Sequence, residues 1–466
     1  MNVIVLLADG ARADWLASAM DSGAVPALTR LRAEGALHDI TTVFPSVTGP
    51  AYVPLLMGRF PGAVGMPGLR WYDRARDICT WPDYSRSYVG YQMMFVDRDL
   101  DPRAPTIFEL VPGSVGALSV ITRGLTRERR LMALVPRTAL RATLTHYFGA
   151  ATAMLAVDRE VAAQAIAHAG ETPYVFAAFA ALDKLSHAKG HESPEVRTAL
   201  SIVDDTVAAI RQKLERRNEW NRTRLWITSD HGHSRVTAHE DLDRVVRDLG
   251  HRVMAHPWVY RSGAEVAVMV CGNSMAHIYV DLARRERPFA GGMSASARSL
   301  ITRLLERPSV DLMLVPESDT ACAVLSATRG RATVSRRDGK YSYTRGDGDP
   351  LQIGGDLRGL SANAAHDAAA TTPYPDALVQ IAELAAAKRS GDVILSAAPD
   401  WDFRLRYEPM PHVSSHGSLR REHMMVPLLT NIAPKRTPRR TTDLMPSALT
   451  ALGVPVPPGL DGESFE

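Results

Sequence analysis

Carboxylate and imidazole side chains follow three separate apolar runs of this sequence, and both are groups that can hold a transition-metal ion. Each run is short and is followed by an Asp, and two of the three also have a His within four residues of that Asp. A single Asp after a strand is commonly the cap of the next helix. Three of them facing one edge of a sheet are harder to explain as caps. The side chains are Asp9, Asp183, His187, Asp230 and His231.

A threonine between two prolines is a further candidate. Thr48 lies in FPSVTGPAY, residues 44–52, and Gly49 follows it. One interpretation is a turn in which the Thr hydroxyl caps the next helix. The other is a nucleophile at a helix N-terminus, where backbone N–H groups can hold a phosphoryl oxygen. A Thr hydroxyl attacks poorly until its proton is removed, and a metal ion can help to remove it.

Short apolar runs predict strands that are buried on both faces, as in a parallel sheet covered by helices. Helical patterns lie between them: Pro26 suits the first position of a helix that stops at Gly35, and residues 195–217 have one apolar stripe. Strands that alternate with helices predict an α/β sandwich, in which chemistry gathers at the carboxyl ends of the strands. The runs are residues 3–8, 174–182, 225–228, 393–397 and 424–429.

Residues 256–372 have a different pattern. Asp338-Gly339 lies between two segments rich in strand-forming residues, which predicts a β-hairpin. Segments rich in Gly and Asp follow it. We therefore expect an inserted α+β domain at residues 256–372, and a main α/β domain made of residues 1–255 and 373–466.

Composition narrows the class of protein. The chain has 466 residues, 45% of them hydrophobic, which suits a globular protein with a large core. A net charge of only +3 argues against a binder of nucleic acid polymers. Cys79, Cys271 and Cys322 are far apart and form no CxxC pair, so we expect no disulfide framework. The N-terminal apolar run is too short for a signal-peptide core, and together these features predict a cytoplasmic location.

Residues 123–141 hold six arginines against one acidic residue, Glu128. One interpretation is the solvated face of a helix. Another is a surface that attracts an anionic substrate, or that makes peripheral contact with membrane lipid. Neither the composition nor the patterns indicate an oligomeric state.

Five segments occur in the order that is found in the alkaline phosphatase superfamily, and the sequence most resembles its type I phosphodiesterase/nucleotide pyrophosphatase family. The resemblance extends over residues 1–60, 174–240 and 411–466. It implies an alkaline-phosphatase-like α/β/α sandwich with an inserted smaller α+β cap domain, and a hydrolase of phosphate esters that depends on two divalent metal ions. The segments are ADGARADW, FPSVTGPAYVPLLMGRFPGAVG, DKLSH, SDHG and SSHGS.

The resemblance also implies roles for individual residues. Thr48 would be the nucleophile, forming a phosphothreonine intermediate from a phosphodiester or a nucleotide pyrophosphate. The ions would be zinc, with manganese or iron as alternatives. One ion would be held by Asp183, His187 and His416, and the other by Asp9, Thr48, Asp230 and His231.

One position departs from the family pattern. Nucleotide pyrophosphatases of this family usually have a phosphate-binding Asn three residues after the nucleophile, where this chain has Ala51. Another donor must replace it, and the Gly49 N–H is a candidate. The alternatives are therefore a phosphomonoesterase, phosphonate hydrolase or phosphomutase of the same superfamily, or a catalytically silent metal-binding scaffold. In each enzymatic case the expected partner is a small-molecule phosphate ester.

Two histidines without an assigned role lie close in sequence to the implied ligands. They are His191 and His233. Most such histidines are surface or core residues. The alternative for these two is the support of a metal ligand or contact with the substrate.

Overall fold

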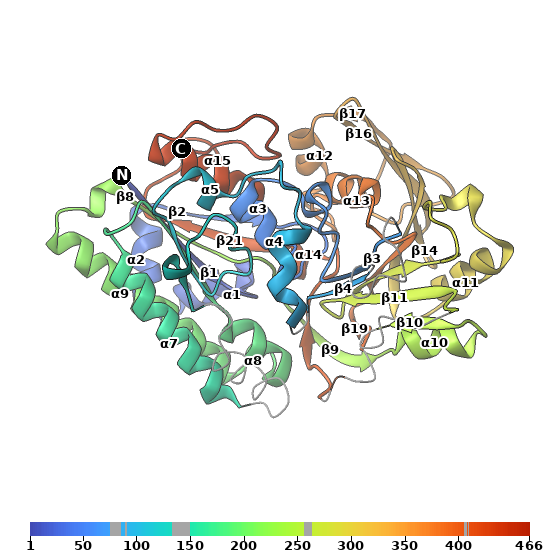
Figure 1. Cartoon of the computed structure of the whole chain (residues 1–466), viewed down its shortest axis with the longest axis horizontal. Coiled ribbons are helices and arrows are strands. Elements are labelled where there is room, and N and C mark those ends of the chain that lie inside the picture. Colours follow the sequence, from blue (N-terminus) through green and yellow to red (C-terminus); the bar gives the residue numbers. More distant parts are fainter. Residues whose placement is uncertain (75–84, 89–90, 133–149, 256–262, 405–407, 409) are drawn as a thin grey trace.

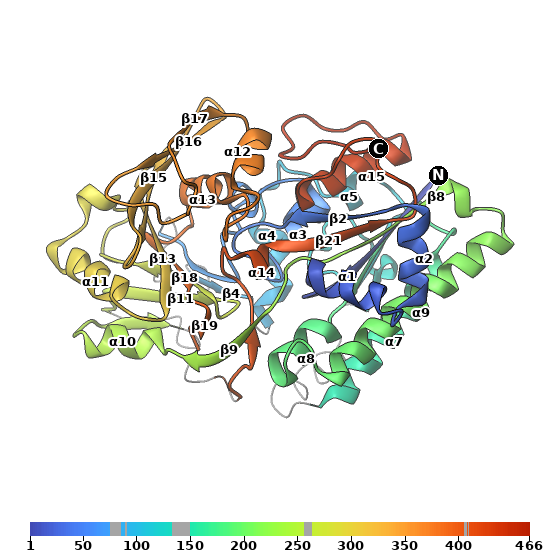
Figure 2. The same ribbon diagram turned by 180° about the vertical axis from the view of Figure 1, so that it is seen from behind.

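The computed structural model describes residues 1–74, 85–88, 91–132, 150–255, 263–404, 408 and 410–466. Two large sheets lie side by side in this part of the chain, each with its own helices (Figure 1). Both chain ends lie on the half that is built around the first sheet, as the view from behind also shows (Figure 2).

The first sheet has a parallel centre and an antiparallel edge. Its strands, in spatial order, are β2 (Ala36–Thr41), β21 (Met425–Thr430), β8 (Thr223–Thr228), β1 (Asn2–Ala8), β7 (Tyr174–Phe179), β5 (Val115–Ala117) and β6 (Arg130–Leu131). β1 pairs in parallel with both β7 and β8, whereas β21 runs antiparallel to β8. The carboxyl ends of β1, β7 and β8 therefore meet at one edge of the sheet.

Helices cover both faces of this sheet, which confirms the predicted α/β/α sandwich. Alternate residues of β1 point to opposite faces, so Val5 and Leu7 join one apolar cluster and Ile4 and Leu6 another. Helices α1 and α2 stand in front in Figure 2. The first cluster includes α3 (Tyr52–Met57), α5 (Ile107–Leu110) and α15 (Leu444–Leu452). The second includes α1 (Ala13–Asp21), α2 (Pro26–Glu34), α7 (Ala151–His168), α8 (Ala181–Lys189) and α9 (Pro194–Arg216).

Two predicted helices are confirmed. α2 begins at Pro26, whose fixed φ suits a first helical position, and its C-cap is Gly35. α9 covers almost all of the predicted residues 195–217 and buries its apolar stripe against the sheet. The Ser193 hydroxyl caps α9 by accepting a hydrogen bond from the Val196 N–H.

The second sheet is antiparallel except where β10 pairs with β11. Its strands, in spatial order, are β10 (Val253–Ala255), β11 (Val266–Cys271), β12 (Met275–Tyr279), β18 (Val393–Ala397), β13 (Val310–Ser318), β14 (Ala321–Ser326), β15 (Gly330–Arg337), β16 (Lys340–Arg345) and β17 (Leu357–Leu360). The predicted hairpin is confirmed: Asp338 and Gly339 join β15 to β16 with φ of 49° and 69°. Positive φ at both turn residues suits a tight two-residue hairpin loop.

Three strand predictions are wrong in part. Residues 393–397 were expected in the parallel sheet but form β18 at the centre of the second sheet, antiparallel to β12 and β13. An apolar run indicates only that both faces are covered, and β18 is covered by different clusters on its two faces. Residues 424–429 join the first sheet, but in the antiparallel strand β21. The run at 174–182 also divides, since β7 ends at Phe179 and α8 begins at Ala181.

The division into a main domain of residues 1–255 and 373–466 and a cap of residues 256–372 stays a prediction. The second sheet contains strands from both sides of the predicted boundary at residue 372, because β18 belongs to it. Helix α13 (Ala377–Ala386) also packs on this sheet, in the apolar cluster that contains Ile394.

Part of the basic segment, residues 133–141, lies outside the described residues. Within residues 123–132, Arg127–Arg129 form a single 3-10 turn and Arg130 begins β6, so the helix expected there is not found in the described part. Among the described residues, no helix combines the length and apolar character that crossing a bilayer requires. Cys79 also lies outside the described residues, and Cys271 and Cys322 are buried free thiols.

Candidate two-metal site

The carboxyl ends of two adjacent parallel strands carry three of the predicted side chains. Asp9 directly follows β1, and Asp230 and His231 follow β8. Because β1 and β8 are paired in register, these residues reach the same point at the edge of the sheet. All three are buried.

The other four predicted side chains come from a helix and two loops. Asp183 lies in the first turn of α8 and His187 one turn later, and this spacing puts both on one face of the helix. His416 follows the short strand β20 (Ser414–Ser415). Thr48 lies in the turn that precedes α3. The structure brings all seven predicted residues together.

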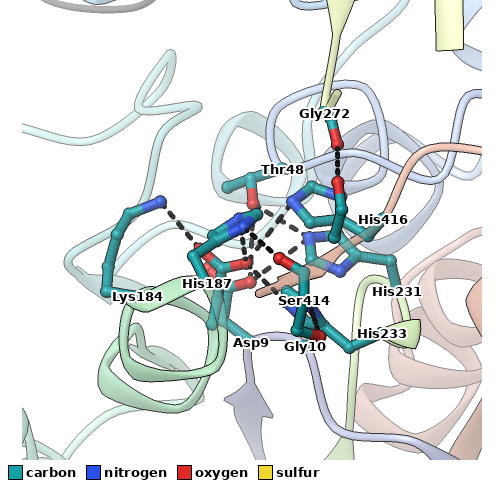
Figure 3. Close-up of polar contacts among 12 residues, drawn as sticks. Asp9, Gly10, Thr48, Lys184, His187, His231, His233, Gly272, Ser414 and His416 are labelled. Carbon is teal, nitrogen blue, oxygen red and sulfur yellow. Dashed lines mark hydrogen bonds and ion pairs between the residues drawn. The ribbon is translucent and has the colours of Figure 1, made fainter. Parts of the chain in front are cut away.

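One group of side chains surrounds a single oxygen of Asp183. Its Oδ1 lies 3.2 Å from His187 Nε2 and 3.4 Å from His416 Nε2 (Figure 3). Two atoms that each lie about 2 Å from one tetrahedrally coordinated ion are about 3.3 Å apart. The spacing is therefore that of neighbouring ligands of one metal ion.

A second group surrounds the predicted nucleophile. Thr48 Oγ1 lies 3.1 Å from His231 Nε2 and 3.4 Å from Asp9 Oδ1 (Figure 3). His231 Nε2 in turn lies 3.4 Å from Asp9 Oδ1 and 3.6 Å from Asp230 Oδ2. In each group the candidate acidic and imidazole ligand atoms all lie within 4.8 Å of one another.

Backbone carbonyls determine which ring nitrogen carries the proton in each predicted His ligand. A carbonyl oxygen can only accept, so the nitrogen beside it, Nδ1, must be the donor. A neutral ring then presents the Nε2 lone pair to the carboxylates. A lone pair that faces a carboxylate is favourable only with a cation between them, as in metal sites whose His ligands are oriented in this way. The pairs are His187 with Ser414 O (2.9 Å), His416 with Ser46 O (2.9 Å) and His231 with Gly232 O (3.2 Å).

The carboxylates of the site repel one another. Burial raises the pKa of Asp9, and the charges of Asp230 and Asp183 raise it further. Burial also raises the pKa of Asp230. Burial alone would raise the pKa of Asp183 as well, but the charge of Lys184 holds it well below its usual range. Bound cations would remove the repulsion between these three groups.

One oxygen of the second group has no hydrogen-bond partner among the described residues. Asp230 Oδ2 is buried and, among the described residues, forms no hydrogen bond. A buried carboxylate oxygen in this state is costly unless an ion binds it. Together with the orientation of the imidazoles, this indicates that the side chains fit divalent cations.

His233, which had no assigned role in the sequence, belongs to the first group. Its Nε2 lies 2.9 Å from Asp183 Oδ1, the length of an N–H···O hydrogen bond, and its Nδ1 lies 3.1 Å from Ser414 Oγ. Its only signal in the sequence is its place two residues after His231, in the loop that follows β8. His191 packs against the Trp15 ring, with centroids 5.4 Å apart, and joins neither group of candidate ligands in the described structure.

A buried residue of another helix holds the start of α8. Asp158, on α7, accepts hydrogen bonds from the Ala180 N–H at 3.0 Å and from the Ala181 N–H at 3.1 Å. These N–H groups belong to the end of α8 that would otherwise lack partners. Asp158 therefore fixes the helix that carries Asp183.

The second sheet reaches the site through the turn between β11 and β12. Gly272 O accepts a hydrogen bond from Ser415 Oγ at 2.9 Å (Figure 3), and the Ser274 N–H donates to His416 O at 3.0 Å. Gly272 has φ of +58°, and a Cβ atom there would lie 2.8 Å from Val47 and 2.9 Å from His416 O. Only glycine allows this close approach.

Position 51 offers no side-chain donor to a substrate. Ala51 is fully buried in an apolar cluster. The Gly49 N–H, beside Thr48, forms no hydrogen bond with the described part of the chain. Its role as the donor to a phosphoryl oxygen stays a prediction.

Comparison with known protein families finds one match. A family model described as type I phosphodiesterase/nucleotide pyrophosphatase matches residues 3–289, which is more than half of the chain. No curated protein matches the sequence.

Solved structures with the same fold include two kinds of hydrolase. Phosphonoacetate hydrolase from Sinorhizobium meliloti 1021, in complex with phosphonoformate, has a TM-score of 0.59 at 16% identity, and the match covers 97% of this chain and 96% of that one. Human ectonucleotide pyrophosphatase/phosphodiesterase 5 has a TM-score of 0.58 at 15% identity, and the match covers 99% and 97% of the two chains. This likeness confirms the predicted alkaline-phosphatase-like fold.

Proposed function

We propose that this chain, which belongs to the type I phosphodiesterase/nucleotide pyrophosphatase family, is a metal-dependent hydrolase of a small-molecule phosphodiester or nucleotide pyrophosphate. The proposal rests mainly on the position of Thr48. Its hydroxyl lies within 3.4 Å of one carboxylate and one imidazole of the second group of candidate ligands. A hydroxyl in that position can be activated as a nucleophile.

The residues divide into two sets of ligands. We propose that the ions are zinc, with manganese or iron as alternatives, because mixed imidazole and carboxylate ligands suit these metals. When bound, the ions would supply positive charge that favours loss of the Thr48 proton and balances charge on the phosphoryl group. Asp183, His187 and His416 would hold one ion, and Asp9, Thr48, Asp230 and His231 the other.

Thr48 is proposed to carry the phosphoryl group between two steps. In the first step Thr48 Oγ1, having lost its proton to solvent, bonds to phosphorus as the ester oxygen leaves and takes a proton from water. In the second step a water oxygen bonds to phosphorus as the bond between phosphorus and Thr48 Oγ1 breaks. One proton of that water passes to Thr48 Oγ1, which regenerates the hydroxyl, and the other passes to solvent. The Gly49 N–H is suited to donate to a phosphoryl oxygen in both steps, because it has no partner in the described structure.

Replacement of Thr48 tests this proposal. In Thr48→Ala, turnover of bis-p-nitrophenyl phosphate should fall by at least about a thousandfold, while most of the metal stays bound, since the other ligands remain. Thr198→Ala, at an exposed position on α9, is the matched control and should keep wild-type activity. Turnover that survives in Thr48→Ala would show that another group is the nucleophile.

A panel of substrates tests the enzymatic alternatives and the silent scaffold. The wild-type protein with two metals bound should cleave bis-p-nitrophenyl phosphate, and its kcat/KM can be compared with those for p-nitrophenyl phosphate and a phosphonate. Binding of both metals without turnover of any of the three would support a silent scaffold. A cytoplasmic location and membrane contact through residues 123–141 stay proposals from the sequence, which fractionation of cells would test.

A further inference from the structure

Lys184 places a positive charge at the edge of the two-metal site. It follows Asp183 on α8, and its Nζ lies 2.7 Å from Asp183 Oδ2 (Figure 3). The Lys184 side chain is 38% exposed, whereas that of Asp183 is fully buried. The Lys184 side chain therefore lies where the buried site meets solvent.

The two oxygens of Asp183 have separate partners. Oδ1 faces the Nε2 atoms of His187, His233 and His416. Oδ2 faces Lys184. Lys184 thus contacts the first group of candidate ligands through Asp183 Oδ2, without taking the place of a ligand.

No other cation in the described structure is placed in this way. Of the lysine and arginine side chains in the described ranges, only that of Lys184 forms an ion pair or hydrogen bond with one of the seven predicted site residues. An ammonium group has three hydrogens, and Lys184 uses one of them within the described structure. Two hydrogens remain for a bound ligand.

The charge balance of the site depends on whether the substrate has one or two negative charges. Two divalent ions bring four positive charges, and the carboxylates of Asp9, Asp183 and Asp230 with a deprotonated Thr48 bring four negative ones. A phosphodiester adds one negative charge, whereas a phosphomonoester dianion or a phosphonate adds two. With Lys184 the site has one net positive charge, and loss of that charge would weaken binding of the doubly negative group more than binding of the diester, because a buried charge without a partner is costly. Ala51 cannot help, since its side chain is apolar and buried.

We infer that Lys184 is a specificity-determining residue that binds the doubly negative phosphoryl group of a phosphomonoester or phosphonate, and so gives this chain an activity on such substrates in addition to diester hydrolysis. This inference rests on the proposed function. It follows from the contact of Lys184 with Asp183, its partial exposure, and the lack of a donor at position 51.

The test compares two substrates that share a leaving group. The variants are Lys184→Gln, which removes the charge at similar length, and Lys184→Arg, which keeps it. The control is Lys189→Gln, at an exposed position on the same helix. The kcat/KM for p-nitrophenyl phosphate and for bis-p-nitrophenyl phosphate would be measured on metal-loaded protein at pH 8, where the monoester is a dianion because its second pKa is about 6.

Lys184→Gln should lower kcat/KM for the monoester about tenfold or more and that for the diester less than about threefold, as expected for the loss of a charged hydrogen bond. Lys184→Arg should keep most of the monoester activity, and Lys189→Gln should match the wild type. The metal content of all the variants should equal that of the wild type. A parallel fall for both substrates, a loss of metal, or no change would each overturn the inference.

Phosphate binding separates failure of this inference from failure of the proposed function. The affinity of metal-loaded protein for inorganic phosphate can be measured by calorimetry and needs no turnover. Lys184→Gln should weaken phosphate binding about tenfold. An unchanged affinity would overturn the role of Lys184 even if the enzyme is active. A protein without any turnover whose phosphate affinity still depends on Lys184 would overturn the proposed hydrolysis of diesters and monoesters alike, but not the binding role of Lys184.

Discussion

The imidazole rings of His231 and His416 lie parallel, with centroids 3.6 Å apart and planes 8° apart. His231 belongs to the group around Thr48, and His416 to the group around Asp183. The two groups of ligands are therefore in contact through these rings. Two ions held this close to each other could act together on one phosphoryl group.

Removal of the metal should abolish activity and also lower stability. Without cations, the buried carboxylates of Asp9, Asp183 and Asp230 repel one another, and the Lys184 ammonium offsets only one of the three charges. Protein treated with a chelator should therefore have a lower Tm than the metal-loaded protein, and added zinc should restore both Tm and activity. Differential scanning calorimetry and ester hydrolysis measure the two effects. An equal Tm with and without chelator would contradict the proposed metal binding.

His233 is expected to hold Asp183 in position through its 2.9 Å contact. His233→Leu removes the hydrogen-bond donor of Asp183 Oδ1 and should weaken metal binding about tenfold to a hundredfold. His233→Gln can present an N–H at a similar place and should keep most of the affinity. Metal titration with a competing chelator measures both variants, and equal affinity in His233→Leu and the wild type would show that the contact has no role.

Gly272→Ala should disturb the site from the side of the second sheet. A Cβ atom at this position would clash with Val47 and with His416 O, and φ of +58° adds backbone strain. We expect a loss of stability of about 2 kcal/mol and a fall in activity. Gly354→Ala is the matched control, because its φ is also positive, at +88°, and its Cβ would contact nothing. The difference in unfolding free energy between the two variants isolates the clash, and equal values would exclude it.

Asp158 should make stability depend on pH. Burial raises the pKa of Asp158 from 3.8 to about 8, although the Ala181 and Ala180 N–H groups lower it in part. At pH values between 3.8 and about 8, the Asp158 carboxyl is therefore protonated in the folded protein and ionised in the unfolded chain. The contribution of Asp158 to stability is complete below about pH 4 and is lost as pH rises through about 8. In Asp158→Asn this side chain cannot titrate. We therefore expect the unfolding free energy of the wild type to fall relative to that of the variant between pH 5 and pH 8. A constant difference would contradict this assignment.

Much of the site could be predicted because parallel strands bring their carboxyl ends to one edge. Asp9 and Asp230 follow β1 and β8, and their convergence is a direct result of that pairing. His416 could be assigned only through family resemblance, since it comes from a loop beyond the second sheet, far from the other ligands in sequence. The spacing of residues in the sequence does not predict that this loop lies beside the ends of the strands.

Two other features could not be predicted for different reasons. The apolar run of β18 is compatible with an antiparallel sheet covered on both faces as well as with a parallel one. Its pattern therefore does not predict which of the two sheets contains this strand. The contact of His233 with Asp183 depends on where α8 lies relative to the loop after β8, and this is set by packing and by the hydrogen bonds of Asp158. Neither is visible in the spacing of residues along the chain.

The turn that joins β11 to β12 has a mechanical consequence. It is bonded to the segment around His416 at Gly272 and at Ser274, and Asn273 pairs with His416 itself as an isolated bridge. Any hinge opening between the two halves of the molecule would pull on this imidazole and change its distance from the Asp183 carboxylate. We therefore expect substrate exchange to proceed without separation of the two halves, since such a separation would displace a candidate metal ligand.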